Sequence, residues 1–314
     1  MARAYITGIG GFIGQHLCNF LIEQGYEVLG SYYDPTTDVA LLPKKARIEK
    51  CDIRDATAVE RAIAAAKPDV IFHLAAQSYP EVSWEKPAYT MEANAIGTIN
   101  LFEAVKRLKL DPVILVACSS AEYGFVSEDE VPVKESHPLL PLHPYGVSKV
   151  AQDLLTYQYF KNDGIRGIRA RIFNTTGPMK SGDVCGNFTQ QAALIKKGKQ
   201  EPIIKVGNLE ARRAITDARD MVRAFELLAR KGEPGEVYNL SGSKVYRVGD
   251  ILDMLLRIAD VRAEIRQDPA LLRPTDEPII YGDSAKVKAI TGWKQEIPIE
   301  RTLTDMLAHW MEVL

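Results

Sequence analysis

The chain has 314 residues, of which 46% are hydrophobic and 25% charged, with a formal net charge of -2. This composition is typical of a globular protein with one large or two modest domains, and it excludes disordered, collagen-like and coiled-coil classes. The near-neutral charge lacks the excess of Lys and Arg that nucleic-acid binding usually requires, so we expect no nucleic-acid partner.

Four cysteines, Cys18, Cys51, Cys118 and Cys185, are widely spaced, and no two form a CxxC pair. We therefore expect reduced core cysteines and no metal site. The N-terminus runs directly into a strand pattern, and no apolar stretch approaches the roughly 18–20 residues of a membrane span. These features predict a soluble, cytoplasmic protein without a membrane partner.

Short apolar runs alternate with amphipathic segments over the first two-thirds of the chain. The predicted strands are Ala4–Thr7, Glu27–Ser31, Arg47–Cys51, Asp69–Leu74, Val113–Ala117 and Gly167–Ile172. The predicted helices between them are Phe12–Gln24, Ala56–Lys67 with Asp55 as its N-cap, Ala95–Leu108 and Ser148–Asn162. Buried strands separated by helices predict an α/β fold with a doubly wound parallel sheet, the Rossmann arrangement.

The pattern changes after Thr175, where the chain becomes richer in Gly, Lys, Gln and Asn. The later predicted elements are a helix near Asn187–Lys197, a strand at Val237–Leu240, and helices at Arg247–Ile258 and Ile299–Leu314. We expect a dinucleotide-binding domain over residues 1–174, with a strand and helix returning at about 214–242. Residues 175–213 and 243–314 are expected to form a smaller, interleaved lobe.

A glycine-rich turn follows the first predicted strand. Gly8, Gly11 and Gly14 recur at every third position, and Phe12 and Ile13 open the first helix. Glycines let the backbone approach a pyrophosphate closely, and the helix N-terminus offers free N–H groups to it. The strict GxGxxG order is not met, but strand, glycines and helix together predict a dinucleotide site.

The end of the second strand normally distinguishes NAD from NADP. Asp34 has the spacing of an acid that binds the ribose hydroxyls, but it equally suits the start of an Asp34-Pro35 turn. No Arg is adjacent, and the small Ser31 leaves room for a 2′-phosphate. This segment alone does not decide between NAD and NADP.

Tyr145 and Lys149 are four residues apart at the start of a predicted helix, so they share a face. A lysine ammonium beside a phenol is expected to lower the phenol pKa from about 10 toward a value useful for acid–base catalysis. Ser119, at the end of the fifth strand, is placed to hydrogen-bond a substrate oxygen. We predict that these three residues are catalytic.

Motifs along the whole chain resemble the extended short-chain dehydrogenase/reductase family. They are Gly8, Gly11 and Gly14, Asp52-Ile53, His73-Leu74-Ala75-Ala76, Asn94, Ser119, and Tyr145 with Lys149. Segments such as Val82–Pro87 and Glu201–Glu210 are similar to the branch of GDP-mannose 4,6-dehydratases and GDP-4-keto-6-deoxy-mannose reductases. The resemblance implies a GDP-hexose substrate and favours NADP(H) over NAD(H).

The resemblance also implies which residues contact the ligands. The cofactor would lie against Gly8, Gly11, Phe12, Ile13, Gly14, Ser31, Tyr32, Asp52, Ile53, Leu74, Ala75, Ala76, Asn94, Tyr145, Lys149 and Phe173. The nucleotide sugar would contact Ser78, Glu122, Asn174, Lys205, Arg213, Arg273 and Glu277. It further implies a homodimer paired through helices 95–108 and 148–162, although burial within one chain accounts equally well for their apolar faces.

One residue separates the possible reactions. The strand-end motif of this chain runs from Ser119 to Tyr123. The dehydratases carry an acid two places before the tyrosine of this motif, where this chain has Ala121, and a methyl group cannot transfer a proton. Glu122 is one residue off and, on an extended strand, would face the opposite way unless a bulge intervenes. We therefore predict 4-keto reduction of a GDP-4-keto-6-deoxy-hexose; a 4,6-dehydratase, a 4-epimerase and a non-catalytic dinucleotide-sensing regulator are the alternatives.

Overall fold

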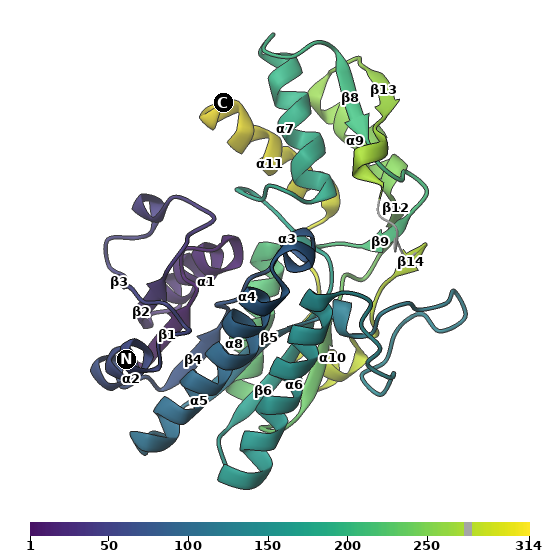
Figure 1. Ribbon diagram of the computed structural model, residues 1–314. Helices are drawn as coiled ribbons and strands as arrows, with labels where there is room; N and C mark the ends of the chain where they lie inside the picture. The colour runs from purple at the N-terminus through teal and green to yellow at the C-terminus, as the bar shows by residue number, and fades with distance from the viewer. Residues whose placement is uncertain (273–277) are drawn as a thin grey trace.

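The computed structural model describes residues 1–272 and 278–314. Its main body is a seven-stranded parallel sheet with the order β11-β6-β5-β4-β1-β2-β3 (Figure 1). The strands are β1 (Arg3–Thr7), β2 (Glu27–Tyr32), β3 (Arg47–Lys50), β4 (Val70–His73), β5 (Val113–Ser119), β6 (Gly167–Ile172) and β11 (Val237–Leu240). This order confirms the predicted doubly wound α/β fold, whose carboxyl strand ends form a ligand-binding edge.

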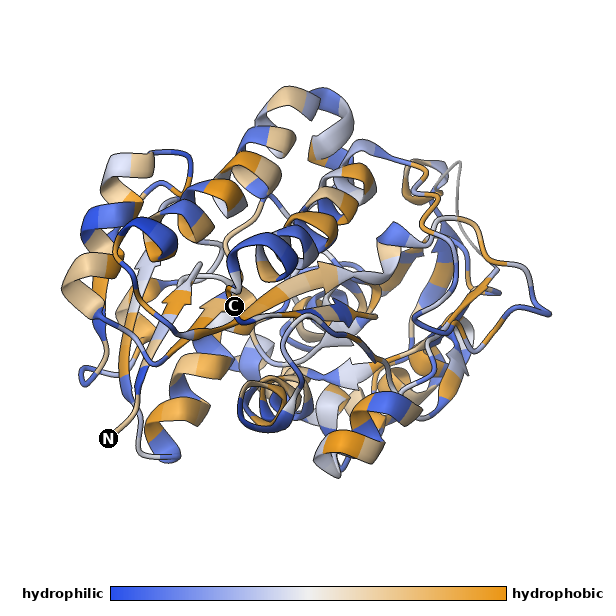
Figure 2. Ribbon diagram, turned by 90° about the horizontal axis from the view of Figure 1, so that it is seen from below, coloured by the Kyte–Doolittle hydropathy of each residue, from blue (hydrophilic) through white to orange (hydrophobic). Residues whose placement is uncertain are grey.

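Helices cover both faces of this sheet. One face packs against α1 (Phe12–Glu23), α8 (Ala218–Lys231) and α10 (Ala285–Thr291), the other against α2 (Ala56–Ala66), α5 (Gly97–Arg107) and α6 (Pro144–Asp163). Neighbours along a strand enter opposite layers: Phe72 joins the first core and Ile71 the second. Figure 2 shows the largely apolar strands between two layers of amphipathic helices.

Local signals explain where two of these helices begin. Asp55 accepts hydrogen bonds from the backbone nitrogens of Thr57 and Ala58, which confirms it as the N-cap of α2. The helix predicted from Ser148 instead begins at Pro144, because proline is well suited to the first helical position. This earlier start places Tyr145 in the first turn.

A second lobe lies at the carboxyl edge of the sheet, at the top of Figure 1. Its apolar core unites α7 (Val184–Lys196), α9 (Val248–Ala259) and α11 (Ile299–Val313) beside the parallel pair β8 (Ile203–Val206) and β13 (Glu264–Gln267). Short strands β9 (Arg212–Ala214), β12 (Val245–Arg247) and β14 (Ile279–Ile280) form another sheet. Between α7 and α9 the chain returns to the main body as α8 and β11.

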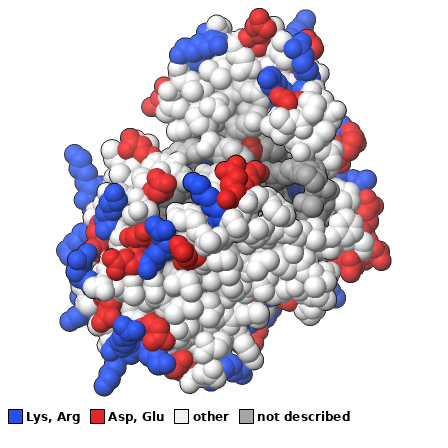
Figure 3. All heavy atoms as spheres, viewed as in Figure 1, with Lys and Arg blue, Asp and Glu red and all other residues white. Residues whose placement is uncertain are grey.

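Short segments complete the region between the lobes. Strands β7 (Thr175–Thr176) and β10 (Thr216–Asp217) pair beside the two crossings of the chain, and α3 (Pro80–Glu85) and α4 (Pro87–Met91) follow β4. Figure 3 shows the surface hollowed between the lobes, with Lys and Arg interspersed among Asp and Glu. The hollow lies where the parallel strands end.

All four cysteines are buried and free. Across residues 1–272 and 278–314, no helix has both the length and the apolar character needed to cross a bilayer.

Candidate active site

Helix α1 begins from a turn built of glycines. Gly8 follows β1 with a φ of +75°, in the left-handed region that favours glycine. A Cβ on Gly8 would lie 2.9 Å from the Ala75 backbone nitrogen, and a Cβ on Gly14 would collide with the Gly8 carbonyl oxygen. Gly11, the N-cap, supplies no side-chain acceptor, and the first turn of α1 contains no acidic residue. The turn thus presents uncapped N–H groups, which fits the predicted dinucleotide phosphates.

A cavity of about 400 Å³ opens over this turn and follows the carboxyl ends of the strands. It contains every residue predicted to bind the cofactor except Asn94, namely Gly8, Gly11, Phe12, Ile13, Gly14, Ser31, Tyr32, Asp52, Ile53, Leu74, Ala75, Ala76, Tyr145, Lys149 and Phe173. The ends of six parallel strands, β1 to β6, meet at this one edge, which is why such distant residues share a cavity.

Asn94 is fully buried and does not line this cavity, so its cofactor contact stays a prediction. Its buried amide accepts a hydrogen bond from the Gln77 backbone nitrogen at 2.7 Å and donates to the Gln77 carbonyl oxygen at 3.0 Å and to Ser148 Oγ at 2.8 Å. The π-helical turn Glu92–Ile96, which precedes α5, carries Asn94 beneath the loop after β4. Asn94 therefore supports the cavity-lining loop that carries Gln77.

The three predicted catalytic residues meet at the inner end of the cavity. Ser119 ends β5, while Tyr145 and Lys149 lie on the first two turns of α6. Lys149 Nζ is 5.7 Å from the centroid of the Tyr145 ring. The Ser119 hydroxyl forms a side-chain hydrogen bond with Tyr145. All three line the same cavity, so a carbonyl group placed there can meet Ser119 and Tyr145 together.

The prediction that Lys149 lowers the pKa of Tyr145 is wrong for this structure. Burial raises the pKa of Tyr145 to about 12, and the hydrogen bond from Ser119 offsets only part of that rise. Burial also lowers the pKa of Lys149 to about 8, against the opposing effect of Cys118 and Glu122. Removal from water penalises phenolate and ammonium alike. At neutral pH both groups therefore hold their protons, and Tyr145 is arranged as a proton donor.

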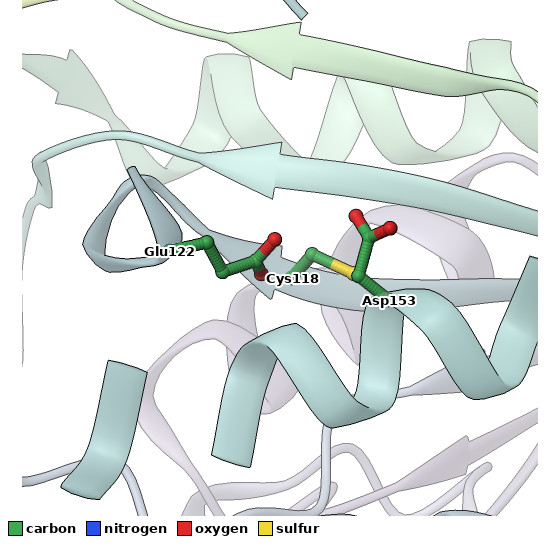
Figure 4. A group of neighbouring side chains, drawn as sticks. All are labelled: Cys118, Glu122 and Asp153. Carbon is green, nitrogen blue, oxygen red and sulfur yellow. The ribbon is translucent and has the colours of Figure 1, made fainter. Parts of the chain in front are cut away.

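Three buried ligand-type side chains lie directly beneath Ser119. Cys118 Sγ and carboxylate oxygens of Glu122 and Asp153 lie within 4.8 Å of one another, on β5, the turn after it and α6 (Figure 4). The guanidinium of Arg171 already provides the balancing charge, with Nε 2.8 Å from Asp153 Oδ2 and 3.2 Å from Glu122 Oε2. We interpret this group as a buried ion-pair cluster.

The same cluster holds Glu122, for which a substrate contact is predicted, away from the cavity. This side chain is fully buried and does not line the cavity. Its Oε1 accepts a hydrogen bond from the Ser119 backbone nitrogen at 2.7 Å. Burial, together with nearby Asp153, raises the pKa of Glu122 to about 8. Residues Ser120–Glu122 form a 3-10 turn rather than extended strand, which directs Glu122 down onto Arg171.

A second cavity of about 390 Å³ adjoins the first and reaches into the smaller lobe. Asn174, Thr175 and Lys180 line both cavities, so they mark the junction. Lys205 and Arg213 line the second cavity, and Ser78 the first. The predicted substrate residues Arg273 and Glu277 lie outside the described residues.

Sequence reasoning missed two cations at these cavities. Lys180 lies at the junction, with Nζ 5.1 Å from the centroid of the Phe12 ring. Arg54 lies at the opposite end of the first cavity, 4.8 Å from the Tyr89 ring centroid, and pairs with Asp52 at 2.6 Å. The Gly177-Pro178 turn just before Lys180 could have indicated that this lysine lies in a loop at the site. Nothing near Arg54 in the sequence distinguishes it from a surface arginine.

A glycine turn on a Rossmann sheet, followed by Ser119, Tyr145 and Lys149 around one cavity, defines an extended short-chain dehydrogenase/reductase. Residues 5–306 match the family described as GDP-mannose 4,6 dehydratase, and the chain belongs to that family.

Individual relatives cover the full chain. A GDP-6-deoxy-D-mannose reductase of Pseudomonas aeruginosa is 33% identical over 98% of this chain and 97% of its own. A GDP-mannose 4,6-dehydratase of Vibrio cholerae is 30% identical over 98% of this chain and 93% of its own. The solved structure of RMD from Pseudomonas aeruginosa complexed with NADPH has a TM-score of 0.87 at 29% identity, covering 100% of both chains.

Proposed function

We propose that this protein reduces the 4-keto group of a GDP-4-keto-6-deoxy-hexose with NADPH. The observation that carries the proposal is the placement of Ser119, Tyr145 and Lys149 around one cavity that opens into a second. The GDP-6-deoxy-D-mannose reductase of Pseudomonas aeruginosa supports the reaction. The similar structure of RMD from Pseudomonas aeruginosa, which was solved with NADPH, supports the cofactor. When bound, NADPH supplies the hydride.

The side chains provide the remaining steps of the reduction. The Ser119 hydroxyl donates a hydrogen bond to the ketone oxygen and so polarises it. Tyr145, whose pKa is about 12, holds the proton that the developing alkoxide requires. The Lys149 ammonium stabilises the phenolate that remains on Tyr145. Each group acts in the protonation state that it has at neutral pH.

Ala121 supports reduction over dehydration. Elimination of water from a hexose needs a group that removes one proton and returns another, and the Ala121 methyl group does neither. The neighbouring carboxylate of Glu122 is turned away from the cavity and paired with Arg171. No acidic side chain of the 3-10 turn therefore faces the sugar.

The residues of the first cavity fit NADP(H). The glycine turn would hold the pyrophosphate, and Asp52, Ile53 and Arg54 lie at the adenosine end. The Arg54 guanidinium supports recognition of a 2′-phosphate, because a planar fork pairs well with phosphate oxygens. Asp34, beyond the end of β2, lines the cavity next to this region.

The second cavity is proposed to hold the nucleotide diphosphate of the substrate. Lys205 and Arg213 line it, and Lys180 stands where it meets the first cavity. Cationic side chains suit a diphosphate, which carries several acceptor oxygens and negative charge. The smaller lobe, residues 175–213 and 243–314, would accordingly be the sugar-nucleotide lobe, and residues 1–174 with 214–242 the dinucleotide domain.

A direct assay tests this proposal. NADPH absorbance is followed after addition of a GDP-4-keto-6-deoxy-hexose, with the corresponding UDP sugar as the control. We expect oxidation of NADPH that depends on the GDP sugar. Conversion of GDP-mannose to a 4-keto product without added NADPH would instead identify a dehydratase and contradict the role given to Ala121.

Replacement of Gly14 by Ala is expected to weaken NADPH binding at least about tenfold, which corresponds to ~1.4 kcal/mol. The new Cβ would collide with the Gly8 carbonyl oxygen and lie 2.8 Å from Ile9 Cα, so the turn must distort. Fluorescence titration with NADPH measures the change. In the control Gly25→Ala a Cβ meets nothing within 4 Å, so only the positive φ of Gly25 is strained and affinity stays unchanged. Equal affinities for both variants would contradict the assigned role of the turn.

The rate of reduction is expected to fall as pH rises through about 8. Burial gives Lys149 a pKa of about 8, so the ammonium is present below that pH and is lost above it. Measurement of kcat with saturating NADPH between about pH 6 and pH 10 shows this alkaline fall. Lys149→Arg, whose guanidinium stays protonated in this range, should remove the alkaline fall from its residual activity. A wild-type kcat that is constant up to pH 10 would contradict the assignment.

We also propose a homodimer formed through α5 and α6. Ile96, the last residue of the π-helical turn that leads into α5, is 47% exposed. Leu154 and Tyr157 are 52% and 41% exposed and lie three residues apart on one face of α6. Exposed apolar residues clustered in this way are typical of an association surface. Sedimentation equilibrium should give twice the mass of one chain, and Leu154→Glu should halve it. A monomeric wild type would contradict the proposal.

A further inference from the structure

The Lys149 ammonium is held by neutral acceptors. Its Nζ donates to the Ala117 carbonyl oxygen at 2.9 Å and to Gln152 Oε1 at 2.7 Å. An ammonium has three N–H donors, so one remains for the cavity that Lys149 lines. Gln152 lies one turn further along α6 and is fully buried.

The neighbours of Gln152 determine which way its amide points. The Thr98 hydroxyl donates to the Asn94 carbonyl oxygen at 2.6 Å, so its lone pairs must accept from its other partners. These partners are Gln152 Nε2 at 2.8 Å and His73 Nε2 at 2.9 Å. Because Nε2 of Gln152 is thus committed as a donor, its Oε1 is left to face Lys149.

The hydrogen-bond chain continues to the cofactor cavity. His73 Nε2 donates to Thr98, so Nδ1 accepts from the Thr7 hydroxyl at 2.8 Å. Thr7 Oγ1 in turn accepts from the backbone nitrogens of Leu74 and Ala75, both at 3.1 Å. These two residues line the first cavity. Gln152 Nε2 also lies 3.4 Å from His73 Nε2, with both nitrogens directed at Thr98. A second proton on His73 would have no acceptor at Thr7, whose lone pairs already accept from Leu74 and Ala75.

We propose that Gln152 is a positioning residue that fixes the Lys149 ammonium beside Tyr145 through this buried chain. The catalytic role given to this placement rests on the proposed function, whereas the placement of Lys149 by Gln152 does not. A neutral amide orients the ammonium without cancelling its charge, so the full field remains available to the phenolate formed on Tyr145. A carboxylate at the same position would hold the ammonium equally well but neutralise it.

Two variants of Gln152 separate orientation from charge. Gln152→Glu keeps the shape of the side chain and adds a negative charge, whereas Gln152→Leu removes the acceptor. The other groups facing Lys149 are His73 from β4, Cys118 from β5, Glu122 from the following turn and Tyr145 from α6, and all are unchanged in both variants. Thr156→Val is the matched control: it removes a buried hydrogen bond to the Gln152 carbonyl oxygen, 2.7 Å long, without touching Lys149.

The primary readout is the titration of Lys149 itself. In protein labelled with ε-13C lysine, the Lys149 resonance is assigned by its loss in Lys149→Met and followed against pH without ligands. We expect the pKa of Lys149 to rise by about one unit or more in Gln152→Glu, to fall in Gln152→Leu, and to be unchanged in Thr156→Val. Unchanged titration in both Gln152 variants would overturn the inference.

Steady-state kinetics supply the second readout. Loss of one hydrogen bond to a charged group predicts a kcat lowered by about 10–100-fold in Gln152→Leu. In Gln152→Glu the alkaline limb of kcat should move upward together with the titration of Lys149. If the titrations shift as expected but no variant or wild type reduces the 4-keto sugar, the proposed function fails and the placement of Lys149 by Gln152 stands. If reduction occurs and is unaltered by Gln152→Leu, the positioning role fails.

Discussion

Replacing Tyr145 by Phe is expected to lower kcat for 4-keto reduction by about 10²–10⁴-fold, the usual contribution of a positioned general acid. The change removes the hydroxyl that carries the proton and that interacts with Ser119, while it keeps the aromatic ring. The Lys149 ammonium would then face a ring that can hold no negative charge. NADPH oxidation with the GDP-4-keto sugar measures kcat, and fluorescence titration measures the Kd for NADPH.

The control for this variant is Tyr157→Phe, which removes the hydroxyl of a 41% exposed tyrosine on the same helix. It should keep wild-type kcat, and the Kd for NADPH should stay within about threefold in both variants, because only transition-state stabilisation is removed. A Tyr145→Phe enzyme that retains full kcat would show that the proton comes from elsewhere, and the catalytic assignment would be wrong.

Arg171→Met is expected to destabilise the fold by about 3–5 kcal/mol, because it removes the buried cation that Asp153 and Glu122 share. The Arg171 side chain is 4% exposed, and Asp153 and Glu122 are fully buried. Asp153 keeps its pair with Arg169 at 2.8 Å but loses the one with Arg171, and Glu122 loses the guanidinium beside it. Urea unfolding followed by circular dichroism measures the change in the free energy of unfolding.

Arg166→Met provides the comparison on an exposed ion pair. Arg166 lies 3.6 Å from Asp111, and the two side chains are 45% and 77% exposed. Loss of such a pair should cost less than about 1 kcal/mol. If Arg171→Met and Arg166→Met unfold at the same urea concentration, the buried cluster does not stabilise the protein in the way described.

Local patterns were sufficient for the seven strands of the main sheet, most of the long helices and the central part of the site, but not for the short helices α3, α4 and α10 or the short strands of the smaller lobe. The apolar run Val113–Ala117 lies within the observed strand β5, because a strand buried on both faces is largely apolar. The predicted strands Gly167–Ile172 and Val237–Leu240 match β6 and β11. The glycine turn and the Tyr145–Lys149 pair were predictable because each of them lies within a single turn and helix.

Contacts between distant segments were not predictable in this way. We argued about Glu122 from the alternation of an extended strand, but β5 ends at Ser119 and a 3-10 turn follows, so that rule does not apply. The partners of Glu122 and Asp153 come from β6, and only the folded chain brings them together. The prediction of a lowered pKa for Tyr145 was wrong for a related reason. A sequence shows the neighbouring lysine but not the loss of water around the phenol.

The path of the chain between the lobes limits how this protein can be divided or recombined. The edge strand β11 and the covering helix α8 are made only after the chain has entered the smaller lobe and left it again. A fragment ending at residue 174 would lack both, exposing one side of β6 and the apolar surface of α1 that α8 covers. Grafting a different lobe to change sugar preference therefore requires junctions at both crossings, and the two parts are expected to unfold as one cooperative unit.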